Sequence, residues 1–455
     1  MIVDTKNGKI QGKDEYSCIV FKGIPYAKAP VGNRRFKRPE PLDKWEGIFD
    51  ATKWGNKCIQ REQEKGSFYQ KEFYDNEEFS ASSGDDCLNL NIYLPLDIDK
   101  KIEGGKKLPV GVYVHGGAFM GGANCHLPFV PTKLVEENVI IVTINYRLGV
   151  FGFLAHPMLS DISGESSCGN YGLWDQLMAF KWVKENIEAF GGDSENITLF
   201  AQSAGAMSLQ IHAVSELSEG LYQKMILQSG GGLRNPIAAF KTGAEGKEYG
   251  EWFFDSICEK KKIARDDLSA IAEYLQNGDS KEIQEISLEV VGRSFREGKG
   301  FAFVPVTDGT ILKKDVNELI VEGGFRKTPY ILGANKNDIT MEEATDFSAL
   351  ANPMEKANID YAMLANRAGA DSFVYYFERS LPGDDSGAFH SAELWYVFGA
   401  LDYCWRKDFF TDQDYELSAK ILKYWTNFMK NSDPNGNGLP KWDKCTNSSK
   451  VLMLG

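Results

Sequence analysis

The stretch ITLFAQSAGA (residues 197–206) decides the fold, because it leads from an apolar run through a serine into small residues. The run ITLFA suits a strand buried on both faces, and a helical pattern continues from the small residues to position 214. A sharp strand-to-helix turn would hold the Ser203 hydroxyl above the sheet. Such turns usually read G-x-S-x-G, and here Ala201 takes the place of the first glycine. A serine that only caps the following helix would also fit this short pattern.

Other apolar runs of strand length occur on both sides of this turn. They are VGVYVH (110–115), VIIVTINY (139–146), KMILQ (224–228), YILG (330–333) and SFVYYF (372–377). Apolar residues at Leu173, Leu177, Phe180, Val183 and Ile187 mark one face of a helix between two of these runs. Strands that alternate with helices predict an α/β fold with a mostly parallel central sheet and helices on both faces. No linker divides the chain, so we expect a single domain over residues 1–455.

A glycine-rich turn follows the run at 110–115. His115, Gly116, Gly117 and Ala118 can point successive backbone N–H groups at one oxygen, as the stabilisation of an oxyanion requires. A plain turn between two elements is the alternative. The combination of this turn with the later serine turn favours an acyl-transfer site beyond the carboxyl ends of the strands.

The amino-acid composition indicates which classes of binding partner to expect. The 455 residues bear a net charge of −13, which argues against nucleic acid and anionic membranes as partners. We see no leader segment and no apolar run long enough to span a membrane, and therefore expect a cytoplasmic protein. The eight cysteines form no C-x-x-C pair, which argues against a structural zinc site. We expect no metal and no cofactor. A monomer or small homo-oligomer is expected.

Several longer strings, in a fixed order, resemble the type-B carboxylesterase and cholinesterase-like family, which includes bacterial para-nitrobenzyl esterases. They are FKGIPYAKAPVGNRRF (21–36), DDCLNLNIYLP (85–95), HGGAF (115–119), NYRLGVFGFL (145–154), GNYGLWDQ (169–176) and FGGDSENITLFAQSAGA (190–206). The resemblance covers nearly the whole chain. It implies an α/β-hydrolase fold and a serine carboxylesterase that acts on small-molecule esters through an acyl-enzyme.

The family places a serine, an acid and a histidine in that order along the chain. The resemblance assigns these roles to Ser203, to Asp338 in NKNDI (335–339) and to His390 in GAFHSAE (387–393). The family's acid is usually a glutamate, so the shorter Asp338 requires a backbone closer to the histidine. Glu342 and Glu343 are the alternative acids. Among the five histidines, only His390 lies in the expected string.

The resemblance also implies the oxyanion donors, which are the N–H groups of Gly117, Ala118 and Ala204. Aromatic side chains near the catalytic strings are candidates for substrate binding, although ordinary core packing would explain them equally well. They are Phe119, Trp395 and Phe398. A hydroxycinnamoyl (feruloyl) esterase is an alternative within the same chemistry, and thioesters, amides or lactones would suit the same triad. A non-catalytic binding module of the family is a distant alternative.

Two further expectations follow from the resemblance. The segment between Asp338 and His390 is shorter than in relatives, which predicts a reduced cap around residues 339–370 and a more open cleft. Cys58 and Cys87 occupy the positions of a disulfide in secreted relatives. We expect them to be close together and reduced.

Overall fold

The computed structural model of the protein describes residues 1–165, 169–339 and 353–455. Its centre is a ten-stranded sheet in the order β13-β12-β11-β10-β9-β7-β8-β6-β4-β3. The strands are β3 (Lys13–Glu15), β4 (Cys18–Pro25), β6 (Asn89–Pro95), β7 (Leu108–Val114), β8 (Ile140–Ile144), β9 (Gly192–Gln202), β10 (Lys224–Gln228), β11 (Tyr330–Asn335), β12 (Ser372–Phe377) and β13 (Val451–Leu454). A small second sheet contains β1 (Ile2–Asp4), β2 (Lys9–Gln11) and β5 (Ile48–Asp50).

The seven strands from β13 to β8 in this order pair in parallel, and β6, β4 and β3 add antiparallel pairs at one edge. The mostly parallel sheet confirms the predicted fold class. All six runs expected as strands are strands, whereas the antiparallel edge was not predicted. Lys22 and Gly23 interrupt the apolar run of β4, and Asn89 and Asn91 interrupt that of β6, so neither sequence contains a long apolar run.

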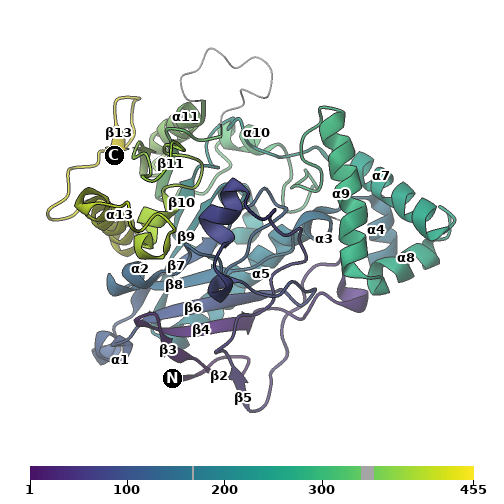
Figure 1. The fold of residues 1–455 in the computed structure, drawn as a ribbon, viewed down its shortest axis with the longest axis horizontal. Coiled ribbons are helices and arrows are strands. Elements are labelled where there is room, and N and C mark those ends of the chain that lie inside the picture. The colour runs from purple at the N-terminus through teal and green to yellow at the C-terminus, as the bar shows by residue number, and fades with distance from the viewer. Residues whose placement is uncertain (166–168, 340–352) are drawn as a thin grey trace.

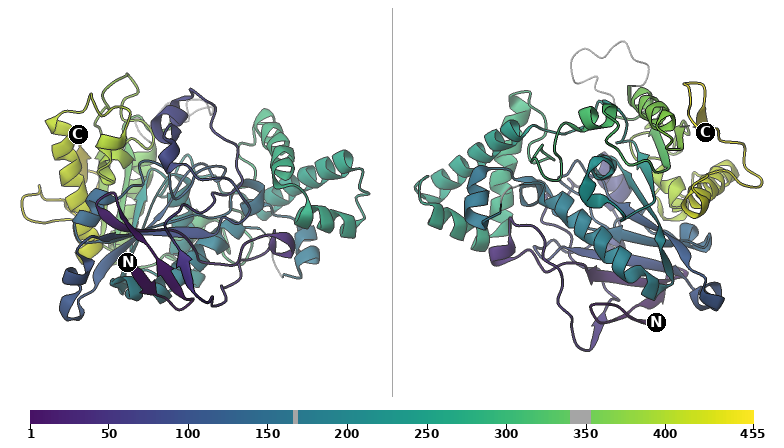
Figure 2. Two further views of the ribbon diagram at one scale, coloured as in Figure 1. Left: turned by 60° about the horizontal axis from the view of Figure 1, so that its bottom comes forward. Right: turned by 180° about the vertical axis from the view of Figure 1, so that it is seen from behind.

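Helices cover both faces of the sheet (Figures 1 and 2). They are α1 (Ile98–Lys101), α2 (Thr132–Glu136), α3 (Gly149–Phe153), α4 (Pro157–Ser163), α5 (Tyr171–Asn186), α6 (Ala204–Val214), α7 (Gly243–Lys261), α8 (Leu268–Asn277), α9 (Ser280–Arg296), α10 (Val316–Val321), α11 (Pro353–Arg367), α12 (Leu394–Val397) and α13 (Asp412–Asn431). Helices α5, α6 and α11 contact the sheet on one face, and α2 and α13 contact it on the other. Helices α7, α8 and α9 extend to the right of the sheet in Figure 1.

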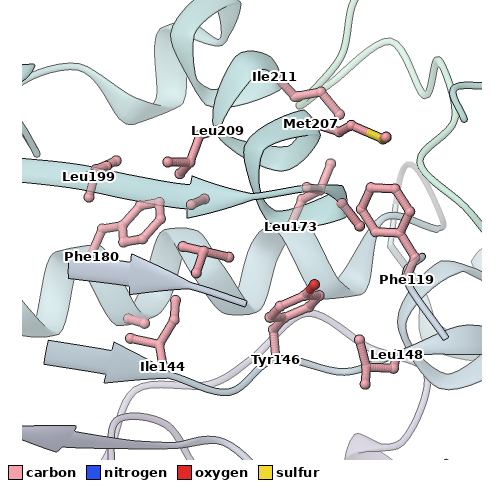
Figure 3. Close-up of a cluster of buried hydrophobic side chains, with 14 of the residues drawn as sticks. Phe119, Ile144, Tyr146, Leu148, Leu173, Phe180, Leu199, Met207, Leu209 and Ile211 are labelled. Atoms are coloured by element: carbon pink, nitrogen blue, oxygen red, sulfur yellow. The ribbon is translucent and has the colours of Figure 1, made fainter. Parts of the chain in front are cut away.

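Each face of the sheet has its own hydrophobic core. Along β9, Leu199 and Ala201 belong to the larger core, whereas Phe200 belongs to the core beneath α13. This alternation explains why the strand sequences are apolar at every position. Figure 3 shows part of the larger core, in which Leu199 lies near Leu209 and Phe180.

The predicted cap segment is described only in part, because residues 340–352 lie outside the described residues. Its remaining helix, α11, contacts β11 and β12 and thus covers the sheet. The expectation of a reduced cap and an open cleft stays a prediction. Among the helices of residues 1–165, 169–339 and 353–455, none has the length and apolar character needed to cross a membrane.

Candidate active site

Ser203 lies at the turn between β9 and α6. Its φ of 55° and ψ of −128° belong to a region that residues other than glycine rarely adopt. The residue occupies the N-cap position of α6, yet its side chain makes no capping hydrogen bond. Ser203 instead lines a cavity. The simple N-cap interpretation therefore does not account for this serine.

Close backbone contacts explain the small residues around the turn. A Cβ atom on Gly205 would lie 2.2 Å from the carbonyl oxygen of Val114, and one on Gly230 would lie 2.2 Å from that of Ser203. Ala201 is fully buried within β9 and has no positive φ. The methyl group that departs from the usual motif is thus accommodated in the core, whereas the second glycine of the motif has no room for one.

The glycine turn after β7 lies beside Ser203. Gly117 has a φ of 109°, and a Cβ atom there would lie 2.1 Å from the carbonyl oxygen of Gly121. Gly117 and Ala118 line the cavity together with Ser203. Ala204 is the first residue of α6, so its N–H has no partner within the helix. Within the described part of the chain, none of these three N–H groups donates a backbone hydrogen bond.

His390 and Asp338 form the buried ion pair of the site. Nδ1 of His390 donates a hydrogen bond to Oδ1 of Asp338, and His390 lines the same cavity as Ser203. Burial lowers the pKa of His390, but the charge and the hydrogen bond of Asp338 outweigh this effect and raise the pKa above its usual value. The carboxylate also accepts hydrogen bonds from the N–H groups of Asn335 and Ile339, both at 3.0 Å.

A backbone bridge holds the acid and the histidine loops together. Asn337 donates its N–H to the carbonyl of Ala388 at 3.0 Å, and its side chain accepts the N–H of Ala388 at 3.0 Å. A Cβ atom on Gly387 would lie 2.4 Å from Oδ1 of Asn337. This close approach brings the short Asp338 side chain within reach of the imidazole.

Gln202 contacts the other ring nitrogen of the histidine. Nε2 of Gln202 lies 3.1 Å from Nε2 of His390. An amide nitrogen can only donate, so this ring nitrogen is the acceptor and the proton resides on Nδ1, opposite Asp338. No hydrogen bond joins Ser203 to His390 among the interactions of the described residues. The sequence analysis assigned no role to Gln202.

A second buried carboxylate lies behind the ion pair. Glu393, the last residue of GAFHSAE, accepts hydrogen bonds from Nδ2 of Asn335 and, at 3.2 Å, from Nε2 of Gln228. Burial raises the pKa of Glu393 to about 7, and the charge of Asp338 adds to this shift. The glutamate was part of a recognised string but had no predicted role.

The remaining histidines have different surroundings. His115 is stacked on Tyr146, and burial lowers its pKa to about 4. His212 bonds to two buried side chains, and Nδ1 of His156 accepts an N–H at the start of α4. His126 lines the cavity, which no sequence motif had indicated.

The cavity has a volume of about 720 Å³ and two different walls. One wall is aromatic and adjoins the His390 loop; it contains Tyr69, Phe73, Tyr74, His126, Leu127, Pro128 and Phe129. The other wall is formed by α3, α9 and the segment after α9; it contains Leu148, Val150, Phe151, Leu288, Val291, Phe295 and Phe301. The described residues contain no group of three or more histidine, cysteine or acidic side chains that could hold a metal ion.

The three aromatic residues expected to bind substrate lie elsewhere. Phe119, Trp395 and Phe398 are fully buried, and none is among the residues that line the cavity within the described chain. Figure 3 shows Phe119 within the larger core. Trp395 stacks behind Phe73, and Phe398 packs behind Phe129. The expectation of direct contact is therefore corrected: two of the rings support aromatic residues of the cavity wall, because neighbouring elements bury them.

The cysteine pair lies within the described residues, whereas the alternative acids do not. Cys58 and Cys87 are buried free thiols, and a hydrogen bond between them, together with burial, raises the pKa of Cys87. The pair is therefore adjacent, as expected. The alternative acids Glu342 and Glu343 lie outside the described residues.

Comparison with known proteins agrees with this geometry. The profile of the Carboxylesterase family matches residues 1–360 and 353–455. The chain belongs to the carboxylesterase family. It is 32% identical to "Acetylcholinesterase 1" of Caenorhabditis elegans, over 92% of this chain and 76% of that protein. It is 28% identical to "Liver carboxylesterase 1" of Oryctolagus cuniculus, over 100% and 89% of the two chains.

Solved structures lead to the same result. A PNB esterase superposes with a TM-score of 0.81 at 29% identity and covers 100% of this chain and 96% of its own. A thermophilic PNB esterase has a TM-score of 0.78 at 28% identity, with the same coverage. The carboxylesterase has the α/β-hydrolase fold and is a carboxylic ester hydrolase.

Proposed function

We propose that this carboxylesterase hydrolyses esters through the triad Ser203, His390 and Asp338 and an acyl-enzyme on Ser203. The observation that carries the proposal is the buried pair of His390 and Asp338 in the cavity that Ser203 lines. A catalytic base needs one ring nitrogen fixed by an acid and the other free to accept a proton. The hydrogen bond to Asp338 fixes Nδ1 of His390, and the contact with the Gln202 amide supports Nε2 as the unprotonated nitrogen.

In the first half of the reaction, Nε2 of His390 takes the proton of Ser203 while Oγ attacks the ester carbonyl. The imidazolium then gives this proton to the oxygen of the leaving alcohol. The charge of Asp338 stabilises the imidazolium without accepting the proton. Water repeats the sequence on the acyl-enzyme, which releases the acid and returns the proton to Ser203.

The oxyanion requires donors that are fixed before the reaction. We assign this role to the N–H groups of Gly117, Ala118 and Ala204, which have no backbone acceptor in the described part of the chain. Such donors gain strength in a site shielded from water, and loss of one typically costs about 100- to 1,000-fold in kcat.

A covalent label tests the nucleophile. A fluorophosphonate should add once per chain, and mass spectrometry should locate the adduct on the peptide that contains Ser203. Ser203→Ala should abolish labelling and lower kcat on the order of a millionfold. Ser287, a second serine that lines the cavity, provides the matched control, and Ser287→Ala should still be labelled. An adduct at another residue, or turnover of more than a few per cent in Ser203→Ala, would refute the assignment.

A further inference from the structure

Within the described residues, the buried side chain of His126 has no hydrogen-bond partner. Only 5% of the residue is exposed, and it lines the cavity. Neither ring nitrogen forms a hydrogen bond with any other described residue of the chain. Neither nitrogen is fully enclosed by the described protein atoms, so a molecule bound in the cavity can form a hydrogen bond that an apolar side chain could not. Such a group therefore indicates a ligand that supplies the missing partner.

The surroundings of His126 restrict the ligand to an aromatic and neutral group. The ring of Tyr74 meets the imidazole edge-on, with 4.6 Å between the ring centroids. Phe73 and Phe129 line the same wall. The nearby cation, Lys57, is already paired with Glu62 at 2.9 Å. Burial and the charge of Lys57 keep the pKa of His126 well below its usual value, so the imidazole is neutral.

A neutral imidazole has one donor and one acceptor nitrogen. A phenolic hydroxyl, which both donates and accepts, can pair with either nitrogen. An aryl ring bearing that hydroxyl would pack against the aromatic wall with edge-to-face or offset contacts. A carboxylate or an ammonium group would lack a counter-charge at this position.

The position of this wall assigns the ligand to one part of the ester. Phe73 contacts Phe389, the neighbour of His390, with ring centroids 6.3 Å apart. Helix α9 lines another part of the cavity and lies to the right of the sheet in Figure 1. The leaving alcohol must lie on the His390 side, because His390 gives its proton to that oxygen. The aromatic wall therefore receives the alcohol part.

We propose that His126 determines specificity by a hydrogen bond to a hydroxyl group on an aryl ring in the alcohol part of the ester. The inference rests on the proposed function, because it uses the direction of proton transfer from His390. The substrates it names are esters of hydroxylated arylalkyl alcohols.

Hydrolysis of matched acetates tests this inference. We would measure kcat/KM for 2-(4-hydroxyphenyl)ethyl and 2-(3-hydroxyphenyl)ethyl acetate and compare each with 2-phenylethyl acetate. One buried hydrogen bond predicts a preference of about tenfold for at least one hydroxylated ester. His126→Phe keeps a ring but removes both nitrogens. In this variant, the ratio of kcat/KM for the hydroxylated ester to kcat/KM for 2-phenylethyl acetate should fall to about one. His126→Asn, which keeps a donor and an acceptor, should retain part of the preference.

Two controls separate binding from folding. His156→Phe makes the same change at a histidine outside the cavity wall and should keep the wild-type ratio. Circular dichroism and thermal unfolding of His126→Phe should match those of the wild type, which shows that the variant folds. If His126→Phe does not fold, inhibition by 2-(4-hydroxyphenyl)ethanol and 2-phenylethanol can be compared in the wild type and in His126→Asn. The inference expects the wild type to bind the hydroxylated alcohol more tightly and His126→Asn to show a smaller difference.

A ratio near one in the wild type would overturn the inference, and so would an unchanged ratio in His126→Phe. Both results leave ester hydrolysis itself intact. Absence of hydrolysis of 2-phenylethyl acetate and of p-nitrophenyl acetate by the wild type would instead refute the proposed function. The hydroxyl preference could also occur only in the acid part of the ester. If methyl 4-hydroxycinnamate were preferred over methyl cinnamate while the hydroxylated and plain arylethyl acetates reacted equally, the assignment to the alcohol part would be overturned.

Discussion

The side-chain amide of Gln202 lies 3.1 Å from Nε2 of His390, the ring nitrogen that must accept the proton of Ser203. Gln202 is the last residue of β9 and immediately precedes Ser203. In the proposed mechanism, the Ser203 hydroxyl must reach this same nitrogen from the adjacent position in the chain. In the proposed mechanism, the amide gives way or shares the nitrogen when the hydroxyl transfers its proton.

Gln202→Glu is expected to shift the pH dependence of hydrolysis. A carboxylate at this position would stabilise the imidazolium and raise the pKa of His390 further. His390 must be neutral to act as a base, so the acid limb of kcat/KM should move to higher pH. Gln284→Glu makes the same change on the α9 wall and should cause a smaller shift. Equal shifts in the two variants would contradict a specific effect of Gln202.

Asp338→Asn is expected to lower kcat on the order of 1,000- to 10,000-fold, because the amide no longer fixes the tautomer of His390. Steady-state kinetics with a p-nitrophenyl ester provides the measurement. Asp338→Glu should retain more activity than Asp338→Asn, since it keeps the charge. If Asp338→Asn kept more than a tenth of the activity, the acid would have to be another residue, such as Glu393.

Gly205→Ala is expected to disrupt the turn at Ser203. The added Cβ would lie 2.2 Å from the backbone oxygen of Val114, which cannot move without the sheet. We expect the free energy of unfolding to fall by about 1–3 kcal/mol. We also expect the variant to lose most of its activity. Ala201→Gly is the matched control, because it restores the usual motif and should keep its activity. Thermal unfolding and kcat of both variants test this, and an active, stable Gly205→Ala would contradict it.

Glu393→Gln is expected to change how stability depends on pH. The pKa of Glu393 is raised from 4.5 to about 7, so the folded protein binds an extra proton between these values. This contribution to stability is complete below about pH 4.5 and is lost as the pH rises through 7, on the order of 3 kcal/mol in all.

The variant removes the titrating group, so its unfolding free energy should fall less than that of the wild type between pH 5 and pH 8. Denaturant unfolding at the two pH values measures this difference. The comparison uses the change with pH within each protein, because the substitution itself disturbs the hydrogen bond from Asn335. Parallel pH curves for the two proteins would show that Glu393 does not titrate in this range.

The local sequence pattern was sufficient to predict the strands of the parallel sheet and the turn at Ser203. Strands buried on both faces are apolar at every position, and the turn needs small residues wherever backbones touch. These requirements act within a few residues, so β10 (Lys224–Gln228) and β12 (Ser372–Phe377) have the predicted bounds. The antiparallel strands β4 and β6 depend on pairing with distant segments, and the polar residues within their sequences interrupt the apolar runs.

The sequence by itself determined the fold class, the candidate nucleophile and, by resemblance, its candidate base and acid. Only the tertiary structure decided which aromatic residues face the cavity. An aromatic residue that lines the wall and one that lies behind it show the same local sequence pattern. Phe73 and Phe129 line the cavity, whereas Trp395 and Phe398 lie behind them. The contact of Gln202 with His390 and the unpaired His126 likewise arise from segments far apart in the chain, whose approach the packing of the sheet and its loops determines.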